Sequence, residues 1–217
     1  TSPSGRYVIS YNGEIYNHLD LRARLHGPWR GGSDTETLLA AIDAWGLPAT
    51  LNALAGMFAL ALWDRQERTL ILARDRLGEK PLYYGWQGAG GRRAFLFGSQ
   101  LSALRAHPAF EDEVAHEAAA SVMWHGCVAG DLSIYRGLRK LPPGAALTVR
   151  LGQDSAGIET YWSGAAAAER AGSAPAGLSD AAANGALGAR LGEVGRRQVV
   201  AGAEVLDLVH DGDRILF

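Results

Sequence analysis

The apolar residues of this chain occur mainly in short, nearly continuous runs that are separated by polar or glycine-rich turns. Runs of this kind are typical of β-strands that are buried on at least one face. The runs at residues 57–63 and 69–73, joined by the polar turn 64–68, predict a β-hairpin. Further strands are expected at residues 7–11, 81–86, 94–98 and 146–151.

Helices are predicted in the segments between these runs. Ser33 followed three residues later by Glu36 is a capping-box pattern, so we expect a helix that begins after Ser33 and covers residues 34–42. Strands that are grouped together and flanked by helices predict an antiparallel α+β layered fold. Shorter helices are expected at residues 18–25, 49–54, 100–106 and 118–125.

Composition and charge narrow the possible functions. Of 217 residues, 47% are hydrophobic and 20% are charged, which is a normal composition for a soluble protein with a real core. The net charge of -2 leaves no basic footprint, so neither nucleic acid nor a membrane is expected as a partner. Cys127 is the single cysteine, which excludes an internal disulfide and favours a cytoplasmic protein. No metal site is expected, because cysteines and histidines do not cluster.

Residues 11–17, with the sequence YNGEIYN, are the strongest candidate for a functional site. We expect the strand 7–11 to end at Asn12-Gly13, a pair that tolerates a turn with positive φ. Asn12 and Gly13 would then offer hydrogen-bond donors to a small polar ligand, and Glu14 an anionic acceptor. An ordinary turn with a solvated glutamate is the alternative interpretation of such a pair.

Four segments together resemble the glutaminase domain of glutamine-hydrolysing asparagine synthetases. This domain is a class II glutamine amidotransferase of the N-terminal-nucleophile (Ntn) hydrolase type. The resemblance extends over residues 5–162 and implies a four-layer αββα sandwich of antiparallel sheets that lacks its first segment. The four segments are residues 11–17 (YNGEIYN), 33–39 (SDTETLL), 56–86 (GMFALALWDRQERTLILARDRLGEKPLYYGW) and 134–144 (IYRGLRKLPPG).

The resemblance implies L-glutamine as the substrate and assigns roles to four residues. In this family an N-terminal cysteine attacks the side-chain amide of glutamine, with its own α-amine as general base. The Asn12 side chain and the Gly13 backbone N–H would form the oxyanion hole. Glu14 and Asp34 would bind the α-ammonium group of glutamine. Asp34 also has a simpler interpretation, as an acidic residue that stabilises a helix N-terminus.

Several expected residues lie outside the motifs that match. The nucleophilic cysteine and the arginine that binds the glutamine carboxylate would precede Thr1, and Thr1 does not replace that cysteine. We expect Cys127 to be a buried packing residue and His125 beside it to be structural. The charged loop 74–80 is interpreted either as solvated ion pairs or as a loop that shapes the glutamine pocket. Because the nucleophilic cysteine would precede Thr1, the 217-residue chain is predicted to be inactive towards glutamine.

The resemblance also predicts how the chain is organised. Residues 1–162 would be an N-terminally truncated glutaminase domain, 163–188 an Ala/Gly/Ser-rich linker, and 189–217 the start of a synthetase-like helix followed by a divergent, hairpin-like tail. The full-length family enzyme uses ATP and Mg to convert aspartate and glutamine into asparagine and glutamate, with AMP and pyrophosphate as the other products. No cofactor is expected in this fragment, because the phosphate-binding loop is absent from it.

Two alternatives keep the same fold. The amide acceptor of the parent enzyme would be a sugar or a peptide in one of them. In the other, the chain would be a degenerate, non-catalytic domain that binds glutamine or regulates a partner. A homodimer is possible in each case.

Overall fold

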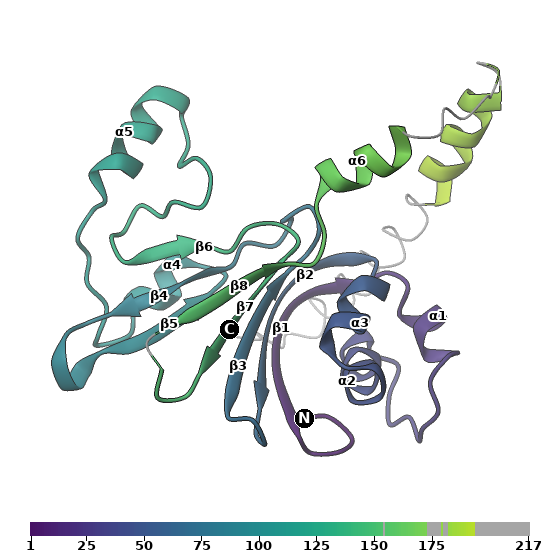
Figure 1. Cartoon of the computed structure of the whole chain (residues 1–217), viewed down its shortest axis with the longest axis horizontal. Coiled ribbons are helices and arrows are strands. Elements are labelled where there is room, and N and C mark those ends of the chain that lie inside the picture. Colours follow the sequence, from purple (N-terminus) through teal and green to yellow (C-terminus); the bar gives the residue numbers. More distant parts are fainter. Residues whose placement is uncertain (154, 173–178, 180–181, 194–217) are drawn as a thin grey trace, which may run out of the picture. The chain divides into compact units, whose positions relative to one another are not determined.

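Two antiparallel β-sheets form the frame of residues 1–163 in the computed structural model of the chain (Figure 1). The structure describes residues 1–153, 155–172, 179 and 182–193. The first sheet has the strand order β1-β2-β3-β7-β8, and the second has the order β5-β4-β6. The strands are β1 (Tyr7–Ile15), β2 (Gly56–Asp64), β3 (Thr69–Arg74), β4 (Tyr83–Gln87), β5 (Ala94–Gly98), β6 (Leu138–Lys140), β7 (Ala145–Arg150) and β8 (Ala156–Thr160).

Helices lie against both sheets. Figure 1 shows α1, α2 and α3 together beside β1 and β2. Helix α4 packs against β5 of the second sheet. The helices are α1 (His18–Arg22), α2 (Asp34–Trp45), α3 (Leu47–Ala53), α4 (Leu101–Arg105) and α5 (His116–His125), with a short 3-10 helix at Gly90–Arg92.

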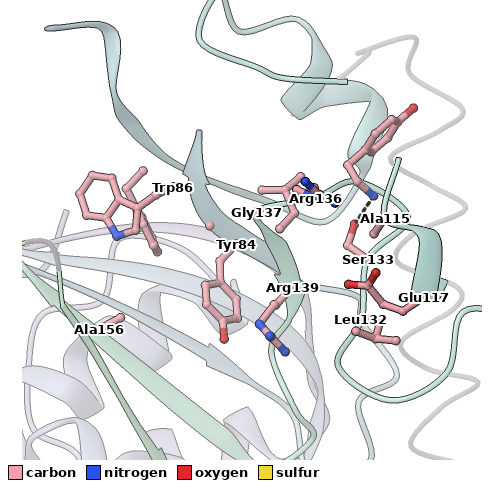
Figure 2. A pocket seen from close by; sticks show the side chains of 14 residues that line it. Tyr84, Trp86, Ala115, Glu117, Leu132, Ser133, Arg136, Gly137, Arg139 and Ala156 are labelled. Carbon is pink, nitrogen blue, oxygen red and sulfur yellow. Dashed lines mark hydrogen bonds between the residues drawn. The ribbon is translucent and has the colours of Figure 1, made fainter. Parts of the chain in front are cut away.

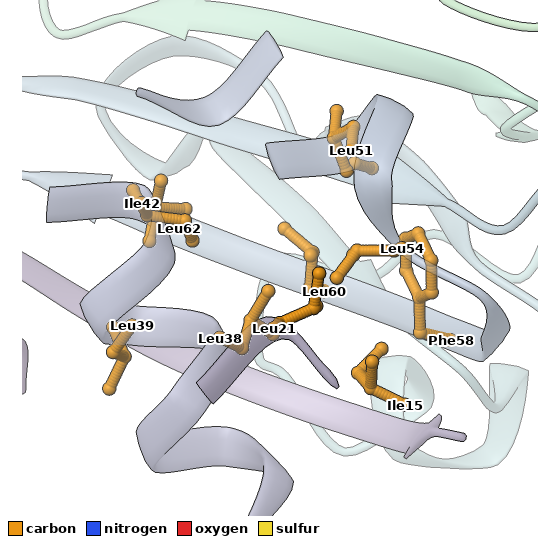
Figure 3. Packing of buried hydrophobic residues seen from close by; sticks show 11 residues of the cluster. Ile15, Leu21, Leu38, Leu39, Ile42, Leu51, Leu54, Phe58, Leu60 and Leu62 are labelled. Atoms are coloured by element: carbon orange, nitrogen blue, oxygen red, sulfur yellow. The ribbon is translucent and has the colours of Figure 1, made fainter. Parts of the chain in front are cut away.

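Strand β2 separates two hydrophobic cores because its residues alternate between the faces of the first sheet. Phe58, Leu60 and Leu62 point towards the helices and pack with leucines and an isoleucine of α1, α2 and α3 (Figure 3). Ala59 and Ala61 point the other way, into the core between the two sheets. Both faces of β2 are therefore buried, which explains its continuous apolar run.

A third core completes the layering. Leu96 of β5 and Leu138 of β6 pack against Leu104 of α4, on the far side of the second sheet from the first. The order of layers is thus helix, sheet, sheet, helix, which confirms the predicted α+β sandwich of antiparallel sheets.

Most predicted elements are present, with shifted ends. The predicted hairpin is confirmed, because β2 pairs with β3 in the register Trp63↔Leu70. The predicted helix 34–42 extends to Trp45, while the predicted helix 18–25 already ends at Arg22. Strand β8 was not predicted, because all of its residues are exposed and it carries no buried apolar face.

The N-terminus of α2 is capped as predicted, but the capping box is only half formed. The Ser33 hydroxyl accepts a hydrogen bond from the Glu36 N–H at 3.2 Å. The Glu36 carboxylate does not return to Ser33; it accepts from the backbone N–H groups of Arg30 (2.7 Å) and Gly31 (3.0 Å). These two hydrogen bonds lower the pKa of Glu36. Glu36 thereby holds the loop that leads to Asp34.

The second unit, residues 164–217, is described in part. Helix α6 covers Gly164–Gly172, and residues 182–193 are also helical. The synthetase-like helix that was expected from residue 189 is described only to residue 193, and the predicted hairpin-like tail lies outside the described residues. None of the helices in the described part of the chain has the length and apolar character that crossing a bilayer needs.

An acidic residue at the end of β2 makes the stability of the first unit depend on pH. Asp64 is buried and accepts hydrogen bonds from the Arg6 guanidinium and from the N–H groups of Gln66 and Glu67. The Arg6 hydrogen bond, more than the backbone donors, holds the pKa of Asp64 below its ordinary value. A carboxyl whose pKa is lower in the folded state stabilises the fold above its unfolded pKa, and that stabilisation is lost as the pH falls through the folded pKa.

We therefore expect the free energy of unfolding to fall below about pH 4, near the unfolded pKa of an aspartate. Asp64→Asn should be less stable than the parent chain at pH 7 and should lose less stability between pH 5 and pH 2. Urea unfolding at a series of pH values measures both effects. Asp112→Asn, a change at an exposed acidic residue, is the control. A parent-like pH profile for Asp64→Asn would contradict the assignment.

Candidate functional site

The YNGEIYN motif does not form the turn that the sequence suggested. Asn12, Gly13 and Glu14 lie inside β1, which continues to Ile15 and pairs with β2 along its whole length. Gly13 is opposite Phe58, and a Cβ atom on Gly13 would lie only 2.2 Å from the carbonyl oxygen of Met57. The glycine is needed for this close approach of two strands, which is why a turn prediction based on Asn-Gly was wrong.

The hydrogen bonds of β1 show where the Gly13 N–H points. The Tyr16 N–H donates to the Ala55 carbonyl, on the β2 side of the strand. The Ile15 N–H points the opposite way and donates to the Asp34 carboxylate at 3.0 Å. Backbone groups of residues two apart in a strand point in the same direction. The Gly13 N–H therefore points away from β2, towards the edge of the sheet at which β1 lies.

The Asp34 carboxylate is hydrogen-bonded to residues of β1 at this edge. One oxygen of its carboxylate accepts from the Ile15 N–H and from the Tyr11 hydroxyl, the latter at 2.8 Å, and the other accepts from the Thr35 hydroxyl at 3.2 Å. Asp34 is also the first residue of α2, as the simpler interpretation of an acidic residue at a helix N-terminus expects. Since a carboxylate has about four lone-pair sites, these three donors leave room for another donor such as an ammonium group.

Tyr11 was not predicted as part of this arrangement. Burial raises the pKa of Tyr11 far above its ordinary value, and the negative charge of Asp34 raises it further. The phenol therefore remains protonated and acts as a hydrogen-bond donor to Asp34. The sequence carried no signal for this contact beyond the aromatic residue at the start of the motif.

Asn12 lies on the other face of β1, because side chains alternate along a strand. Its Nδ2 donates to the Ser99 hydroxyl at 3.0 Å. Ser99 directly follows β5, so this contact links the first sheet to the second. Glu14 lies two positions after Asn12 and shares its face of β1. Ser99 was also missed, since it is far from Asn12 in the sequence.

The prediction that Cys127 is buried is wrong, and one of the two interpretations of the loop 74–80 is contradicted. Cys127 is exposed rather than buried, because it follows the end of α5, and His125 in the last turn of that helix is exposed as well. In the loop 74–80, the side chains of Arg74 and Asp75 do not form solvated ion pairs. The Arg74 guanidinium donates to three backbone carbonyls, and Asp75 is 1% exposed and accepts from backbone N–H groups.

A cavity of about 440 Å³ lies elsewhere, between the second sheet and the start of α5 (Figure 2). None of the four predicted site residues lines it. Arg136 and Arg139 at its wall form ion pairs with Glu113 and Asp131. Among the described residues, no group of three or more histidine, cysteine or acidic side chains is arranged to hold a metal ion.

Comparison with known proteins defines the class. The family model of the glutamine amidotransferase domain matches residues 1–162 of this chain. The solved glutamine phosphoribosylpyrophosphate amidotransferase of B. subtilis, complexed with ADP and GMP, superimposes with a TM-score of 0.51 at 20% identity, covering 75% of this chain and 30% of that one. That likeness supports the Ntn-hydrolase type of fold. The chain belongs to the class II glutamine amidotransferase domain family.

Relatives that carry the name asparagine synthetase are similar to part of this chain. "Asparagine synthetase [glutamine-hydrolyzing] 3" of Bacillus subtilis is 36% identical over 160 residues, which are 72% of this chain and 25% of the relative. "Asparagine synthetase B [glutamine-hydrolyzing]" of Escherichia coli is 43% identical over 86 residues, which are 39% of this chain and 15% of the relative. The chain spans about a quarter of the length of the first of these relatives.

Proposed function

We propose that this chain provides the glutamine-binding part of the glutaminase domain in an ATP-dependent asparagine synthetase. The parent reaction would convert aspartate, glutamine and ATP into asparagine, glutamate, AMP and pyrophosphate. The family assignment and the names of the relatives support this proposal. The observation that carries it is structural: the Gly13 N–H points to the edge of the sheet formed by β1. It lies beside Asn12 and close to the hydrogen bond between Ile15 and Asp34.

The chemistry of amide hydrolysis explains why these groups belong together. Attack on the side-chain amide of glutamine converts its carbonyl oxygen into an oxyanion, which fixed N–H donors stabilise. The second N–H of the Asn12 amide and the Gly13 N–H are such donors, because one is held by Ser99 and the other by the sheet. Glu14 and Asp34 carry the negative charge that attracts the α-ammonium group.

In the described part of the chain, neither Cys127 nor Thr1 is placed to act as the nucleophile. Cys127, the single cysteine, follows α5 and is exposed. Thr1 precedes β1, and Gly13 lies six residues beyond the start of that strand at Tyr7, a distance of roughly 20 Å at the rise of an extended chain. We infer that the 217-residue chain binds glutamine without hydrolysing it.

The test is a titration of the 217-residue chain with L-glutamine, followed by two-dimensional NMR of backbone and side-chain amides. We expect saturable shifts at Asn12, Gly13 and Glu14, much smaller shifts with D-glutamine, and no ammonia release in a coupled assay. Glu14→Gln should weaken binding by about tenfold, because it removes a charged hydrogen-bond acceptor. Glu159→Gln, at an exposed glutamate of β8, is the matched control.

Three outcomes would count against the proposal. Shifts that are absent at the β1 residues would contradict glutamine binding at this site. Equal affinities for L- and D-glutamine would contradict the assigned roles of Glu14 and Asp34. Ammonia release by the purified chain would contradict the inference that it lacks glutaminase activity.

A further inference from the structure

The hydrogen bond between Asn12 and Ser99 joins the two sheets at the proposed oxyanion hole. Asn12 Nδ2 lies 3.0 Å from the Ser99 Oγ, and the two residues come from β1 and from the segment directly after β5. Asn12 and Ser99 are both partly buried. A primary amide has two N–H groups, and this contact uses one of them.

Fixing one N–H of an amide also fixes the other, because both lie in the plane of the same carboxamide group. Without the contact, the Asn12 side chain is able to rotate and to present its carbonyl oxygen where a donor is needed. An oxygen in that position would repel an oxyanion. Preorganised donors stabilise developing charge best, since they need no reorientation at the moment of reaction.

The residues on either side of Ser99 lie against Leu104 of α4. Gly98 is the last residue of β5, and a Cβ atom there would lie 3.2 Å from the Cδ2 atom of Leu104, a buried residue of α4. The Leu104 N–H donates to the Gln100 carbonyl, which closes the first turn of that helix. Ser99 thus lies between two residues that both contact Leu104, a member of the third core.

We propose that Ser99 is a positioning residue that orients the Asn12 amide for the side-chain amide of glutamine. This inference rests on the proposed function, because it assigns a role within the same site. It predicts a selective effect. Ser99 acts on recognition of the side-chain amide, whereas Glu14 and Asp34 act on the α-ammonium group.

L-Norvaline separates these two effects, because it keeps the α-ammonium and α-carboxylate groups of glutamine but has a methyl group in place of the amide. Ser99→Ala should weaken L-glutamine binding by about three- to tenfold, the range expected for one neutral hydrogen bond, and should leave L-norvaline binding unchanged. Ser99→Thr keeps the hydroxyl and should behave like the parent chain. Ser102→Ala, at an exposed serine of α4, is the matched control.

The side-chain NH2 signals of Asn12 give a second readout that needs no ligand. In the parent chain, the proton that faces Ser99 should be protected from exchange and well separated in chemical shift from its partner. Ser99→Ala should remove that separation, and Ser99→Thr should preserve it. This measurement tells a positioning role from a general loss of structure, because backbone signals of β1 should remain in place.

The possible outcomes distinguish failure of the Ser99 role from failure of the proposed function. Unchanged Asn12 signals in Ser99→Ala, or equal losses of affinity for L-glutamine and L-norvaline, would overturn the positioning role while leaving the proposed function intact. Failure of the parent chain to bind L-glutamine would instead overturn the proposed function, and the role of Ser99 with it. A selective loss for L-glutamine together with altered Asn12 signals supports the proposal.

Discussion

Replacing Gly13 by alanine is expected to abolish glutamine binding and to destabilise the fold by about 3 kcal/mol or more, above the usual range for overpacking. The new Cβ atom would lie 2.2 Å from the Met57 carbonyl oxygen and 2.6 Å from the Phe58 Cα atom. Both are backbone atoms of β2, so no side chain is able to move aside. Strand β1 would have to shift away from β2, and the Gly13 N–H would move with it.

Urea unfolding of Gly13→Ala and of the parent chain measures the loss of stability, and the glutamine titration measures the loss of binding. Gly27→Ala is the matched control, because a Cβ atom on Gly27 has no atom within 4 Å. A Gly13→Ala chain with the stability and the glutamine affinity of the parent would show that β1 tolerates the shift. That result would argue against a fixed oxyanion donor at this position.

The parts of the fold that depend on neighbouring residues were predictable from the sequence. Two apolar runs around a polar turn gave the β2–β3 hairpin, because strand pairing across a short turn needs little else. Ser33 gave the start of α2, because a hydroxyl at that position accepts a hydrogen bond from an N–H three residues later. In both cases the interaction partners lie within a few residues of each other.

Contacts between distant segments were not predictable in this way. Strand β8 is held by backbone pairing to β7, which needs no particular side chains and leaves no hydrophobic pattern. Gly13 was interpreted as a turn residue, because in a sequence a glycine needed for close strand approach looks the same as a glycine needed for positive φ. The two kinds of glycine are distinguished only by the structure, in which Gly13 lies opposite Phe58 of β2.

In the candidate site, too, local motifs were predictable and contacts between distant segments were not. Asn12, Gly13 and Glu14 were predicted from one local motif, and the family resemblance added Asp34 and the individual roles. In the structure the first three lie on β1, and the Asp34 carboxylate is hydrogen-bonded to the same strand. The residues that hold these groups in place, Tyr11 and Ser99, were not predicted. Their function depends on which atoms they face across the fold, and no spacing in the sequence records that.

Asp75 illustrates how much of the site depends on a residue outside it, and Asp75→Ala is the second change expected to have a large effect. The Asp75 carboxylate is 1% exposed and accepts hydrogen bonds from four backbone N–H groups. They belong to Phe58 at 3.2 Å and to Leu77, Glu79 and Lys80 at 3.0 Å. Alanine would leave these donors without their acceptor in a buried place, which costs roughly 3–5 kcal/mol in comparable cases.

The expected loss is a large share of the total stability of a domain, which is typically about 5–15 kcal/mol. Urea unfolding of Asp75→Ala, with the exposed Asp112→Ala as control, measures it. A loss below about 1 kcal/mol would mean that water or other groups replace the carboxylate, since that is the worth of a single ordinary hydrogen bond. Asp75→Asn should not restore stability, because its amide group would direct N–H donors at other N–H donors.

The consequence should reach the proposed glutamine site through β2. Phe58 donates its N–H to Asp75 and lies opposite Gly13 in the β1–β2 pair. Asp75 therefore fixes the strand against which Gly13 is packed, although it touches none of the proposed ligand-binding residues. Under conditions in which Asp75→Ala remains folded, we expect weaker glutamine binding together with shifted NMR signals of Gly13 and Phe58. Unchanged signals at both residues would show that β1 and β2 hold the site without this carboxylate.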